Sequence, residues 1–460
     1  MGSSRVRTAG LVGLVVVLAA GAGIGGYAET HALRAADTAK SSSSPASTPA
    51  AYAAAGSTPS PVASGSAGAA PRPAAVAQVL APGLSAPGLG KQLRARVVDV
   101  RSGTVLYDRG GAAAAPPAST AKVVTAAALF AVRKPTDRIT TSVVAGRGGA
   151  IVLVGAGDPT LTAAAKGASG AYPGAARITD LAAQLRAKNV RATQIVVDDS
   201  LFSGPTVSPN WAPEDVPSTY ASAITAVLAD GGRAAPGDAV RSAQPDLPAA
   251  HALAAALGNP GLPVSRAKAP TGAAVLARVE SAPLATLVEQ MLQTSDNVIA
   301  ECLARQVALA EHTPASFAGA AAAVRVVVRR LGTDPGPGLL DGSGLAAGDR
   351  VSPAALAGVL RTVSASSAPA LHSVASALPV AAWSGTLASR YRGSSTQAGA
   401  GVIRAKTGTL TGVSSLVGLV HDRDGRLLAF AFIADRTGAT PAAEAALDVL
   451  AARLAGCGCR

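Results

Sequence analysis

The chain has few aromatic side chains and few charges. Phe, Trp and Tyr make up 3% of its 460 residues, and Asp, Glu, Lys and Arg together make up 15%. The net charge of +13 comes mostly from scattered arginines, and no dense block of Lys and Arg occurs. Without such a block, and with few aromatics to stack on bases, nucleic-acid binding is disfavoured. Genome composition would explain the charge, and an anionic cell envelope would also suit it.

Cysteines are scarce as well, and the three in the chain are Cys302, Cys457 and Cys459. An odd number cannot all pair within one chain, so we consider a bridge from one tail cysteine to Cys302, provided that the fold brings them together. A metal site at the two tail cysteines is disfavoured because no His or further Cys lies nearby. We therefore expect neither a metal nor a cofactor.

The sequence also lacks the usual features of a Ser-His-Asp hydrolase. No Gly-x-Ser-x-Gly pattern occurs, and none of the five histidines lies beside such a pattern. A serine hydroxyl is a poor nucleophile without a base. A lysine can act as that base when its ammonium is desolvated or lies beside another cation, because either condition favours the neutral amine.

The first 35 residues resemble an export segment. Arg5 and Arg7 precede an uncharged apolar run, residues 9–28, which is about as long as the ~20 residues that span a bilayer. Gly26-Tyr27-Ala28 is a mediocre signal-peptidase site, so residues 1–35 fit a cleaved signal peptide and a retained membrane anchor equally well. We expect a protein that works outside the cytoplasm, with residues 9–28 as its candidate membrane tether.

Composition suggests how the rest of the chain is organised. Residues 36–78 are rich in Ser, Pro, Ala and Gly and predict a flexible linker. Two hairpins are predicted at the ends of the folded part, within 92–110 and 414–435, and a helix follows from Thr440-Pro441 to about Leu454. These strands predict one antiparallel sheet assembled from distant parts of the chain. Residues 136–275 have strands of their own, such as 150–157 and 193–200, and we expect them to form one or more inserted domains between residues 79–135 and 276–460.

The stretch PPASTAKVVTAAALF, residues 116–130, has Ser119 and Lys122 one helical turn apart on one face. By itself this pair could be no more than a helix start. The same spacing recurs at Ser265 and Lys268, but the prolines on either side exclude a long helix there, so we expect those two residues in a loop.

Two further motifs follow in the chain. Ser295-Asp296-Asn297 stands before a predicted helix, and capping of that helix by Ser295 or Asp296 would explain it alone. Lys406-Thr407-Gly408 leads toward the second hairpin, where the glycine permits a close approach of a substrate backbone, although a strand end with a glycine bend would also account for it. In this order Ser-x-x-Lys, Ser-Asp-Asn and Lys-Thr-Gly are the signature of class A β-lactamases and penicillin-binding proteins.

The chain thus resembles the penicillin-recognising serine enzymes. Within them it is most similar to the D-alanyl-D-alanine carboxypeptidase/endopeptidase family of penicillin-binding protein 4 type, peptidase family S13. The separation between Ser119 and Ser295 is far larger than in a class A β-lactamase, and that family fills it with inserted domains. The resemblance covers about residues 80–455 and includes the segments 155–161, 196–205, 339–353 and 378–391.

The resemblance implies an α+β fold, in which a β-lactamase/transpeptidase-like domain, an antiparallel sheet flanked by helices, carries an inserted region that forms additional small domains. It also implies the reaction. Ser119 would attack the carbonyl between two D-alanines of a peptidoglycan stem peptide, with Lys122 as general base beside the charge of Lys406. Ser295 would relay a proton to the leaving amine, and Asn297 would hold the peptide amide or position Lys122.

Substrate binding is assigned to Lys406, Thr407, Gly408 and Thr409 by the same resemblance. Lys406 and Thr407 would bind the terminal carboxylate, and the Thr409 N–H would form the oxyanion hole with that of Ser119. A β-lactam would acylate Ser119 and leave slowly. The sequence does not decide between carboxypeptidase and D,D-endopeptidase activity. A serine β-lactamase is the alternative, disfavoured by the lack of Glu-x-x-Leu-Asn, and a non-catalytic cell-wall-binding protein is disfavoured by three intact motifs. We expect Asp341-Gly342-Ser343-Gly344 to shape the rim of the site.

Overall fold

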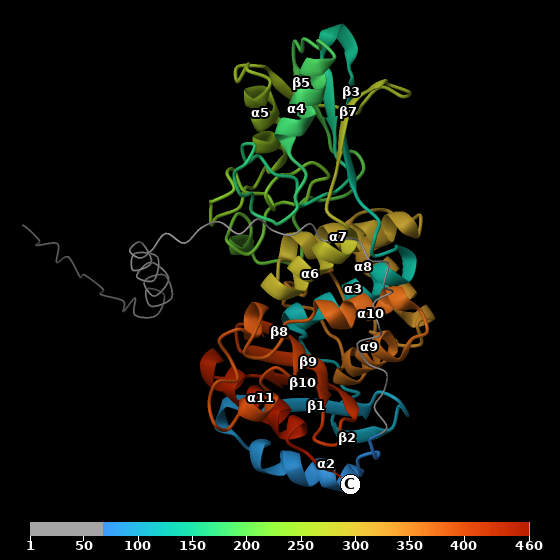
Figure 1. The fold of residues 1–460 in the computed structure, drawn as a ribbon, viewed down its shortest axis with the longest axis vertical. Helices are drawn as coiled ribbons and strands as arrows, with labels where there is room; N and C mark the ends of the chain where they lie inside the picture. The colour runs from blue at the N-terminus through green and yellow to red at the C-terminus, as the bar shows by residue number, and fades with distance from the viewer. Residues whose placement is uncertain (1–67, 460) are drawn as a thin grey trace, which may run out of the picture. The chain divides into compact units, whose positions relative to one another are not determined.

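Strands from both ends of the folded part make up the first of two five-stranded sheets. The computed structural model describes residues 68–459, and this sheet has the order β2-β1-β10-β9-β8, with all neighbours antiparallel (Figure 1). Its strands are β1 (Gln92–Asp99), β2 (Val105–Arg109), β8 (Arg404–Leu410), β9 (Val413–His421) and β10 (Leu427–Asp435). Both predicted hairpins are confirmed, and β1 joins them by pairing with β10.

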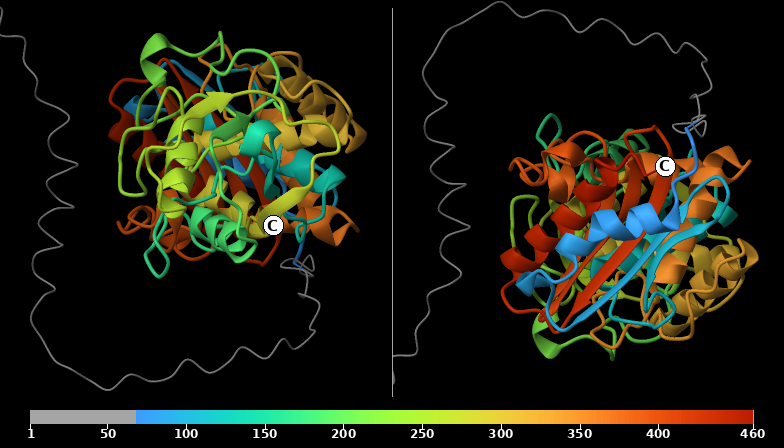
Figure 2. Two further views of the ribbon diagram at one scale, coloured as in Figure 1. Left: turned by 90° about the horizontal axis from the view of Figure 1, so that it is seen from above. Right: turned by 90° about the horizontal axis from the view of Figure 1, so that it is seen from below.

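The first sheet carries a hydrophobic core on each face because successive side chains of a strand point to opposite faces. Phe430 and Phe432 of β10 belong to one core, and Ala431 and Ile433 belong to the other. The helices α2 and α11 cover the face of the two phenylalanines (Figure 2, right). On the opposite face α9 packs against β1 and β10, and α3 packs against α9. The helices of this part are α2 (Pro73–Leu80), α3 (Ala121–Val132), α6 (Leu284–Thr294), α7 (Asn297–Ala310), α8 (Phe317–Arg330), α9 (Pro353–Ala365), α10 (Pro369–Ala377) and α11 (Thr440–Ala455).

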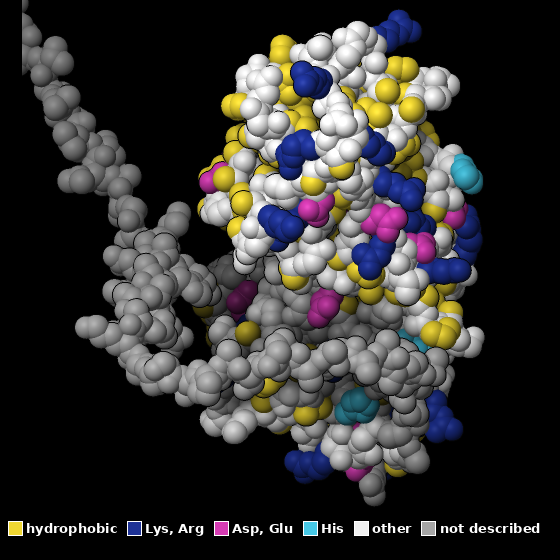
Figure 3. Space-filling model, turned by 45° about the horizontal axis from the view of Figure 1, so that its top comes forward, with side chains coloured by type: hydrophobic (Ala, Val, Ile, Leu, Met, Phe, Trp, Pro, Cys, Tyr) yellow, Lys and Arg dark blue, Asp and Glu magenta, His cyan; other side chains and the backbone are white. Residues whose placement is uncertain are grey.

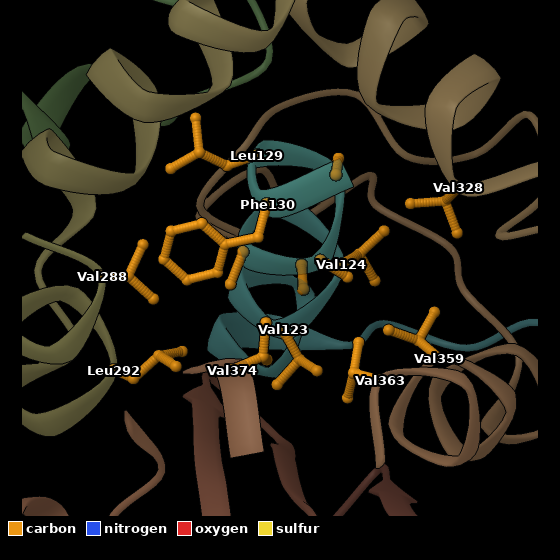
Figure 4. Packing of buried hydrophobic residues seen from close by; sticks show 14 of the residues in the cluster. Val123, Val124, Leu129, Phe130, Val288, Leu292, Val328, Val359, Val363 and Val374 are labelled. Atoms are coloured by element: carbon orange, nitrogen blue, oxygen red, sulfur yellow. The ribbon is translucent and has the colours of Figure 1, made fainter. Parts of the chain in front are cut away.

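Helix α3, which follows Ser119, is enclosed by other helices. Figure 4 shows its Val123, Val124, Leu129 and Phe130 among valines and leucines of α6, α8, α9 and α10. All ten residues from Ala121 to Phe130 are buried. Since interiors are close-packed, the start of this helix has a fixed position relative to the surrounding helices.

The second sheet is formed by the region predicted to be an insertion. It has the order β6-β5-β4-β3-β7, in which β3 runs antiparallel to β4 and β7, and β4, β5 and β6 are parallel. The helices α4 and α5 pack on it through the core formed by residues such as Leu181, Leu253, Leu153 and Ile195. The elements are β3 (Thr140–Ala145), β4 (Ile151–Val154), α4 (Ile178–Ala187), β5 (Ile195–Asp198), α5 (Asp246–Ala256), β6 (Val264–Arg266) and β7 (Val275–Glu280).

Two expected boundaries and one expected loop need correction. The linker was expected to extend to residue 78, but α2 begins at Pro73, and its Val76 and Leu80, one turn apart, are fully buried. The inserted region was expected to end at residue 275, whereas β7 pairs with β3 as far as Glu280. Ser265 was expected in a loop and lies in the short strand β6. The predictions for residues 1–67, namely the export segment and most of the linker, lie outside the described residues.

The bridge to Cys302 that the sequence left open does not form. Cys457 and Cys459 form a disulfide with each other, and Cys302 is a free, buried thiol. The physical reason is packing: Cys302 lies on α7 against Phe317, while the tail cysteines pack with α2 and α11 on the far face of the first sheet. The tail is also held by the N–H of Arg72, which donates a hydrogen bond to the Cys459 carbonyl at 2.7 Å.

The basic side chains are scattered over the surface, as they are along the sequence. On the face shown in Figure 3, Lys and Arg side chains are spread among acidic, hydrophobic and other side chains instead of forming one block. Within residues 68–459, no helix has the length and apolar character that crossing a membrane requires.

Candidate active site

Ser119 lies in a short 3₁₀ turn, Ala118–Thr120, that leads directly into α3. Ala118 has a φ of 48°, a left-handed conformation that costs a residue other than glycine about 1–3 kcal/mol. Two hydrogen bonds to the Pro117 carbonyl support this strained turn, from Thr120 Oγ1 at 2.6 Å and from Ser415 Oγ of β9 at 2.7 Å. The turn leaves Ser119 partly exposed at the junction of α3 and the first sheet.

The buried ammonium of Lys122 connects the parts of the site. Its Nζ donates hydrogen bonds to Ser119 Oγ at 2.9 Å, to Asn297 Oδ1 at 2.6 Å and to the Ser343 carbonyl at 2.7 Å. Burial lowers the pKa of Lys122 to about 8, against the opposing effect of nearby carboxylates, of which Asp341 has the largest effect. A substantial fraction of this lysine is therefore neutral near pH 8, as a base for a serine requires.

Ser295 and Asn297 reach the site from the turn between α6 and α7. Ser295 adopts a left-handed conformation, with φ 60° and ψ 34°, and it ends α6. Asp296 caps α7 by accepting the N–H groups of Val298 and Ile299, so the capping explanation holds for Asp296. Because Asp296 satisfies these donors, the side chains of Ser295 and Asn297 are available for contacts with the two buried lysines.

Asp296 is held from the inserted region. Arg241 NH2 lies 2.7 Å from Asp296 Oδ2, and the Tyr172 hydroxyl donates to the same oxygen at 2.7 Å. Burial by itself would raise the pKa of Asp296, but Arg241 brings the pKa below its usual value. The turn that carries Ser295 and Asn297 thus depends on a buried ion pair with a segment far away in the sequence.

Strand β8 borders the site on the side of the first sheet. Lys406 is fully buried and donates from Nζ to Ser295 Oγ at 2.9 Å and to the Thr407 carbonyl at 2.7 Å. Burial, together with the charges of Lys122 and Arg390, places the pKa of Lys406 well below its usual value. The hydroxyl of Thr407 is hydrogen-bonded to that of Thr386 at 2.9 Å.

Gly408 and Thr409 bring the backbone of β8 beside Ser119. A Cβ added to Gly408 would lie 3.0 Å from the Ser119 nitrogen and 2.8 Å from the Pro117 carbonyl oxygen. The strand can therefore come this close to the turn only because residue 408 is a glycine. Ala405 donates its N–H to Pro379 O, away from β9. Because N–H directions alternate along a strand, the N–H of Thr409 also points to this open edge. Its side chain is exposed and donates to Glu444 at 3.2 Å.

The structure brings together all three motifs, and it adds one contact that sequence reasoning missed. Residues 341–344 were expected at the rim, but Asp341 and Ser343 are fully buried, and the Ser343 carbonyl contacts Lys122. The Asp-Gly-Ser-Gly pattern signals a tight turn, which can present a backbone carbonyl to a neighbouring group. The second Ser-x-x-Lys pair lies elsewhere, where Ser265 accepts a hydrogen bond from Gln194.

The serine hydroxyl is hydrogen-bonded to a buried lysine, and a sheet edge with a second buried lysine lies beside it. This arrangement defines a serine acyl-transfer enzyme of the β-lactamase/transpeptidase fold. The model of the D-Ala-D-Ala carboxypeptidase 3 (S13) family matches residues 76–238 and 234–454. The chain belongs to this family, and it is a serine-type carboxypeptidase. The predicted family, fold class and enzyme class are confirmed.

Relatives and solved structures agree with this assignment. A carboxypeptidase of Mycobacterium tuberculosis is 43% identical over 396 residues, covering 84% of this chain and 85% of that protein. Carboxypeptidase DacB of Mycolicibacterium smegmatis is 41% identical over 391 residues, with 84% of each chain covered. The crystal structure of penicillin binding protein 4 from Haemophilus influenzae superposes with a TM-score of 0.69 at 22% identity, covering 82% of this chain and 98% of that one, so it shares the fold.

Proposed function

We propose that this enzyme removes the terminal D-alanine from peptidoglycan stem peptides outside the cytoplasm, through an acyl-enzyme on Ser119. The observation that carries the proposal is the 2.9 Å hydrogen bond between Lys122 Nζ and Ser119 Oγ, made by a fully buried lysine. Burial keeps the pKa of this lysine at about 8, low enough for the neutral amine to take the serine proton.

Acylation begins when neutral Lys122 takes the hydroxyl proton of Ser119. Ser119 Oγ then attacks the carbonyl carbon of the D-Ala-D-Ala bond, and the backbone N–H groups of Ser119 and Thr409 stabilise the negative oxygen that forms. Asn297 and the Ser343 carbonyl hold the Lys122 amine in place during this step. Three hydrogen bonds on one nitrogen leave it little freedom to rotate away from the serine.

The same residues account for cleavage of the C–N bond. The terminal carboxylate of the substrate pairs with Lys406 and the hydroxyl of Thr407, which orients the last D-alanine. Ser295, bound to Lys406 at 2.9 Å, passes a proton to the nitrogen as the bond breaks and takes up the proton that Lys122 removed from Ser119, so free D-alanine leaves and Lys122 is neutral again. Water then attacks the ester on Ser119 with Lys122 as base, which releases the shortened peptide and restores the serine hydroxyl.

Cross-linked peptides and β-lactams would react at the same serine. In a D,D-endopeptidase reaction the leaving amine belongs to the side chain of a second stem peptide, and the acyl-enzyme is identical. The crystal structure of Haemophilus influenzae penicillin binding protein 4 with a bound β-lactam has a TM-score of 0.61 and 23% identity to this chain. We expect a penicillin to acylate Ser119 and to leave slowly, because the sequence lacks the Glu-x-x-Leu-Asn of class A β-lactamases.

The domain organisation and the membrane tether belong to this proposal too. Residues 9–28 would serve as export signal or tether, and the Ser- and Pro-rich stretch after them would separate the enzyme from the membrane. The second sheet, with α4 and α5, would act as a domain inserted into the catalytic one. Its contact with the site through Arg241 and Asp296 supports a structural role for it.

Labelled penicillin tests the nucleophile. We expect a stable adduct on the wild type and none on Ser119→Ala, and the matched control Ser265→Ala, the other serine of a Ser-x-x-Lys pair, should be labelled normally. Labelling of Ser119→Ala would refute the assignment. Incubation with a D-Ala-D-Ala peptide should release D-alanine, and monomers released from cross-linked muropeptides would add endopeptidase activity. An adduct that turns over within a second would instead indicate a β-lactamase.

A further inference from the structure

Three carboxyl groups lie buried behind Lys122, and the mechanism above uses none of them. Glu301 belongs to α7, and Asp341 and Asp349 belong to the segment between α8 and α9. All three side chains are fully buried. Burying charged groups is costly unless they are paired or protonated, so the state and the partners of each acid matter.

Two of the three have settled partners. Asp341 accepts hydrogen bonds from Ser343 N, Gly344 N and Ala346 N, and from the Trp211 indole at 2.8 Å. Asp349 accepts the N–H of Leu340 at 2.6 Å, and burial together with the charge of Asp341 raises the pKa of Asp349 to about 10. Asp349 is therefore neutral at physiological pH, and four donors stabilise the charge of Asp341.

Glu301 is less well compensated and is joined more directly to the site. Its Oε1 accepts the N–H of Gly342 at 3.0 Å, and the carbonyl of the following residue, Ser343, accepts a hydrogen bond from the Lys122 ammonium. The Ser343 hydroxyl is hydrogen-bonded to the same carboxylate. Glu301 thus holds Gly342 and Ser343, and the carbonyl of Ser343 helps to position Lys122.

The cation beside Glu301 compensates it only in part. Arg305 NH1 is 3.5 Å from Glu301 Oε2, at the outer limit of a hydrogen bond, and the guanidinium lies over the ring of Phe317 at 4.1 Å. Among residues 68–459, the other two guanidinium nitrogens of Arg305, Nε and NH2, find no hydrogen-bond partner. Burial and the charge of Asp341 raise the pKa of Glu301 to about 7, so its charge changes near neutral pH.

We propose that Glu301 is a positioning residue for Lys122: it anchors Gly342 so that the Ser343 carbonyl stays on the lysine, and its negative charge raises the pH at which the lysine loses its proton. The inference rests on the proposed function, in which Lys122 is the base for Ser119. The titratable groups that act on Lys122 are Asp296, which caps α7, Glu301 of α7, Asp341 and Asp349 of the segment between α8 and α9, and Lys406 of β8.

Among these groups Glu301 is the one that can be neutralised with least change of structure. Asp296 is paired with Arg241, Asp349 is already neutral, and Asp341 holds four donors that a variant would leave unpaired. Glu301→Gln keeps an oxygen that can accept the Gly342 N–H and removes the charge. Without that charge Lys122 loses its proton at a lower pH.

The test is the rate of acylation by labelled penicillin, measured from about pH 5 to about pH 9. In the wild type the acid limb should be broader than a single ionisation, because protonation of Glu301 weakens proton binding by Lys122. In Glu301→Gln the limb should become a single ionisation and its midpoint should move down by about half a pH unit or more. Glu289→Gln, a matched change at an exposed position of α6, should leave the profile unchanged.

A milder variant covers the case in which Glu301→Gln does not fold. Ser343→Ala keeps the backbone carbonyl and removes the hydroxyl bound to Glu301, so Glu301 is less ionised near pH 7, and the limb should move in the same direction by a smaller amount. A limb that stays at the wild-type position in the folded variants would overturn the inference, even if the rate falls. Failure of the proposed function looks different, because then Ser119→Ala would still be labelled or the wild type would not be.

Discussion

Lys406 and Ser295 are joined by a 2.9 Å hydrogen bond between Nζ and Oγ, although 110 residues lie between them in the sequence. The bond links the substrate-binding strand β8 to the turn that also carries Asn297, and Asn297 in turn binds Lys122. The two buried lysines are therefore connected through two polar side chains of one turn, those of Ser295 and Asn297. In the proposed reaction, this arrangement would let lysines and a serine move the proton from the nucleophile to the leaving group without a histidine.

Removing the Ser295 hydroxyl should impair proton delivery to the leaving amine. For Ser295→Ala we expect kcat/KM for release of D-alanine to fall about 10²–10⁴-fold, the usual contribution of a positioned proton donor. Its denaturation midpoint should stay close to that of the wild type, because Ser295 is partly exposed and Asp296 makes the helix cap. Ser265→Ala is the control, and activity within twofold of wild type in Ser295→Ala would contradict the role.

Carboxypeptidase activity should rise with pH through about pH 8. Lys122 must be neutral to act as base, and burial lowers its pKa to about 8. Below that value the rate of acylation should fall, by less than about tenfold per pH unit near pH 7, where Glu301 also takes up a proton, and by about tenfold per unit at lower pH. A rate that is flat from about pH 6 to about pH 9 would show that Lys122 does not limit the reaction through its protonation.

The same pKa affects stability. Lys122 has a pKa of about 8 in the folded chain and the ordinary value of 10.5 in the unfolded chain, so between these values the unfolded chain binds the additional proton. The contribution of Lys122 to the free energy of unfolding should therefore rise with pH across this window, by about 3 kcal/mol in total. Urea unfolding of the wild type and of Lys122→Met at several pH values isolates this contribution to the free energy of unfolding. An identical pH dependence in the two proteins would contradict the lowered pKa of Lys122.

Gly408→Ala should damage the site through a single methyl group. Its Cβ would lie 3.0 Å from the Ser119 nitrogen and 2.8 Å from the Pro117 carbonyl oxygen, both backbone atoms that cannot rotate aside. We expect a loss of about 1–3 kcal/mol of stability and a large loss of acylation, because β8 or the serine turn must shift. Gly438→Ala is the matched control, since no atom lies within 4 Å of the added Cβ there.

Breaking the ion pair between Arg241 and Asp296 should destabilise the protein strongly. Arg241→Met leaves a buried carboxylate without its cation, which typically costs about 3–5 kcal/mol. Part of the acylation rate should be lost too, because Asp296 orders the turn of Ser295 and Asn297. Arg329→Met, which breaks the exposed pair with Asp334, should cost less than about 1 kcal/mol, and equal effects of the two substitutions would contradict the argument.

Local patterns in the sequence predicted the motifs and the hairpins because both depend on residues close together. Ser119 and Lys122 are one helical turn apart, and the turn at Asp424-Gly425 lies between two apolar strands, so short-range physics suffices. The resemblance then supplied what spacing could not, namely that three distant motifs form one site.

Long-range packing explains what the sequence did not predict. The helix at Pro73–Leu80 has the composition of a linker, and it is stabilised by burial of Val76 and Leu80 against the first sheet and α11. Lys122 contacts the backbone carbonyl of Ser343, and a backbone carbonyl is present at every residue, so the sequence does not indicate this contact. The disulfide of the tail follows from where Cys302 is buried, which depends on the whole fold.

The pairing of β1 with β10 has a consequence for biogenesis. The central strands of the first sheet come from residues 92–99 and 427–435, so a nascent chain cannot complete this sheet until almost the entire polypeptide has left the ribosome. Sheets that depend on such distant pairings fold slowly, because the entropy of a long loop is lost before the contacts form. Acyl-transfer activity should thus require the complete sheet, and a chain that stops before residue 427 would contain every catalytic motif and remain inert.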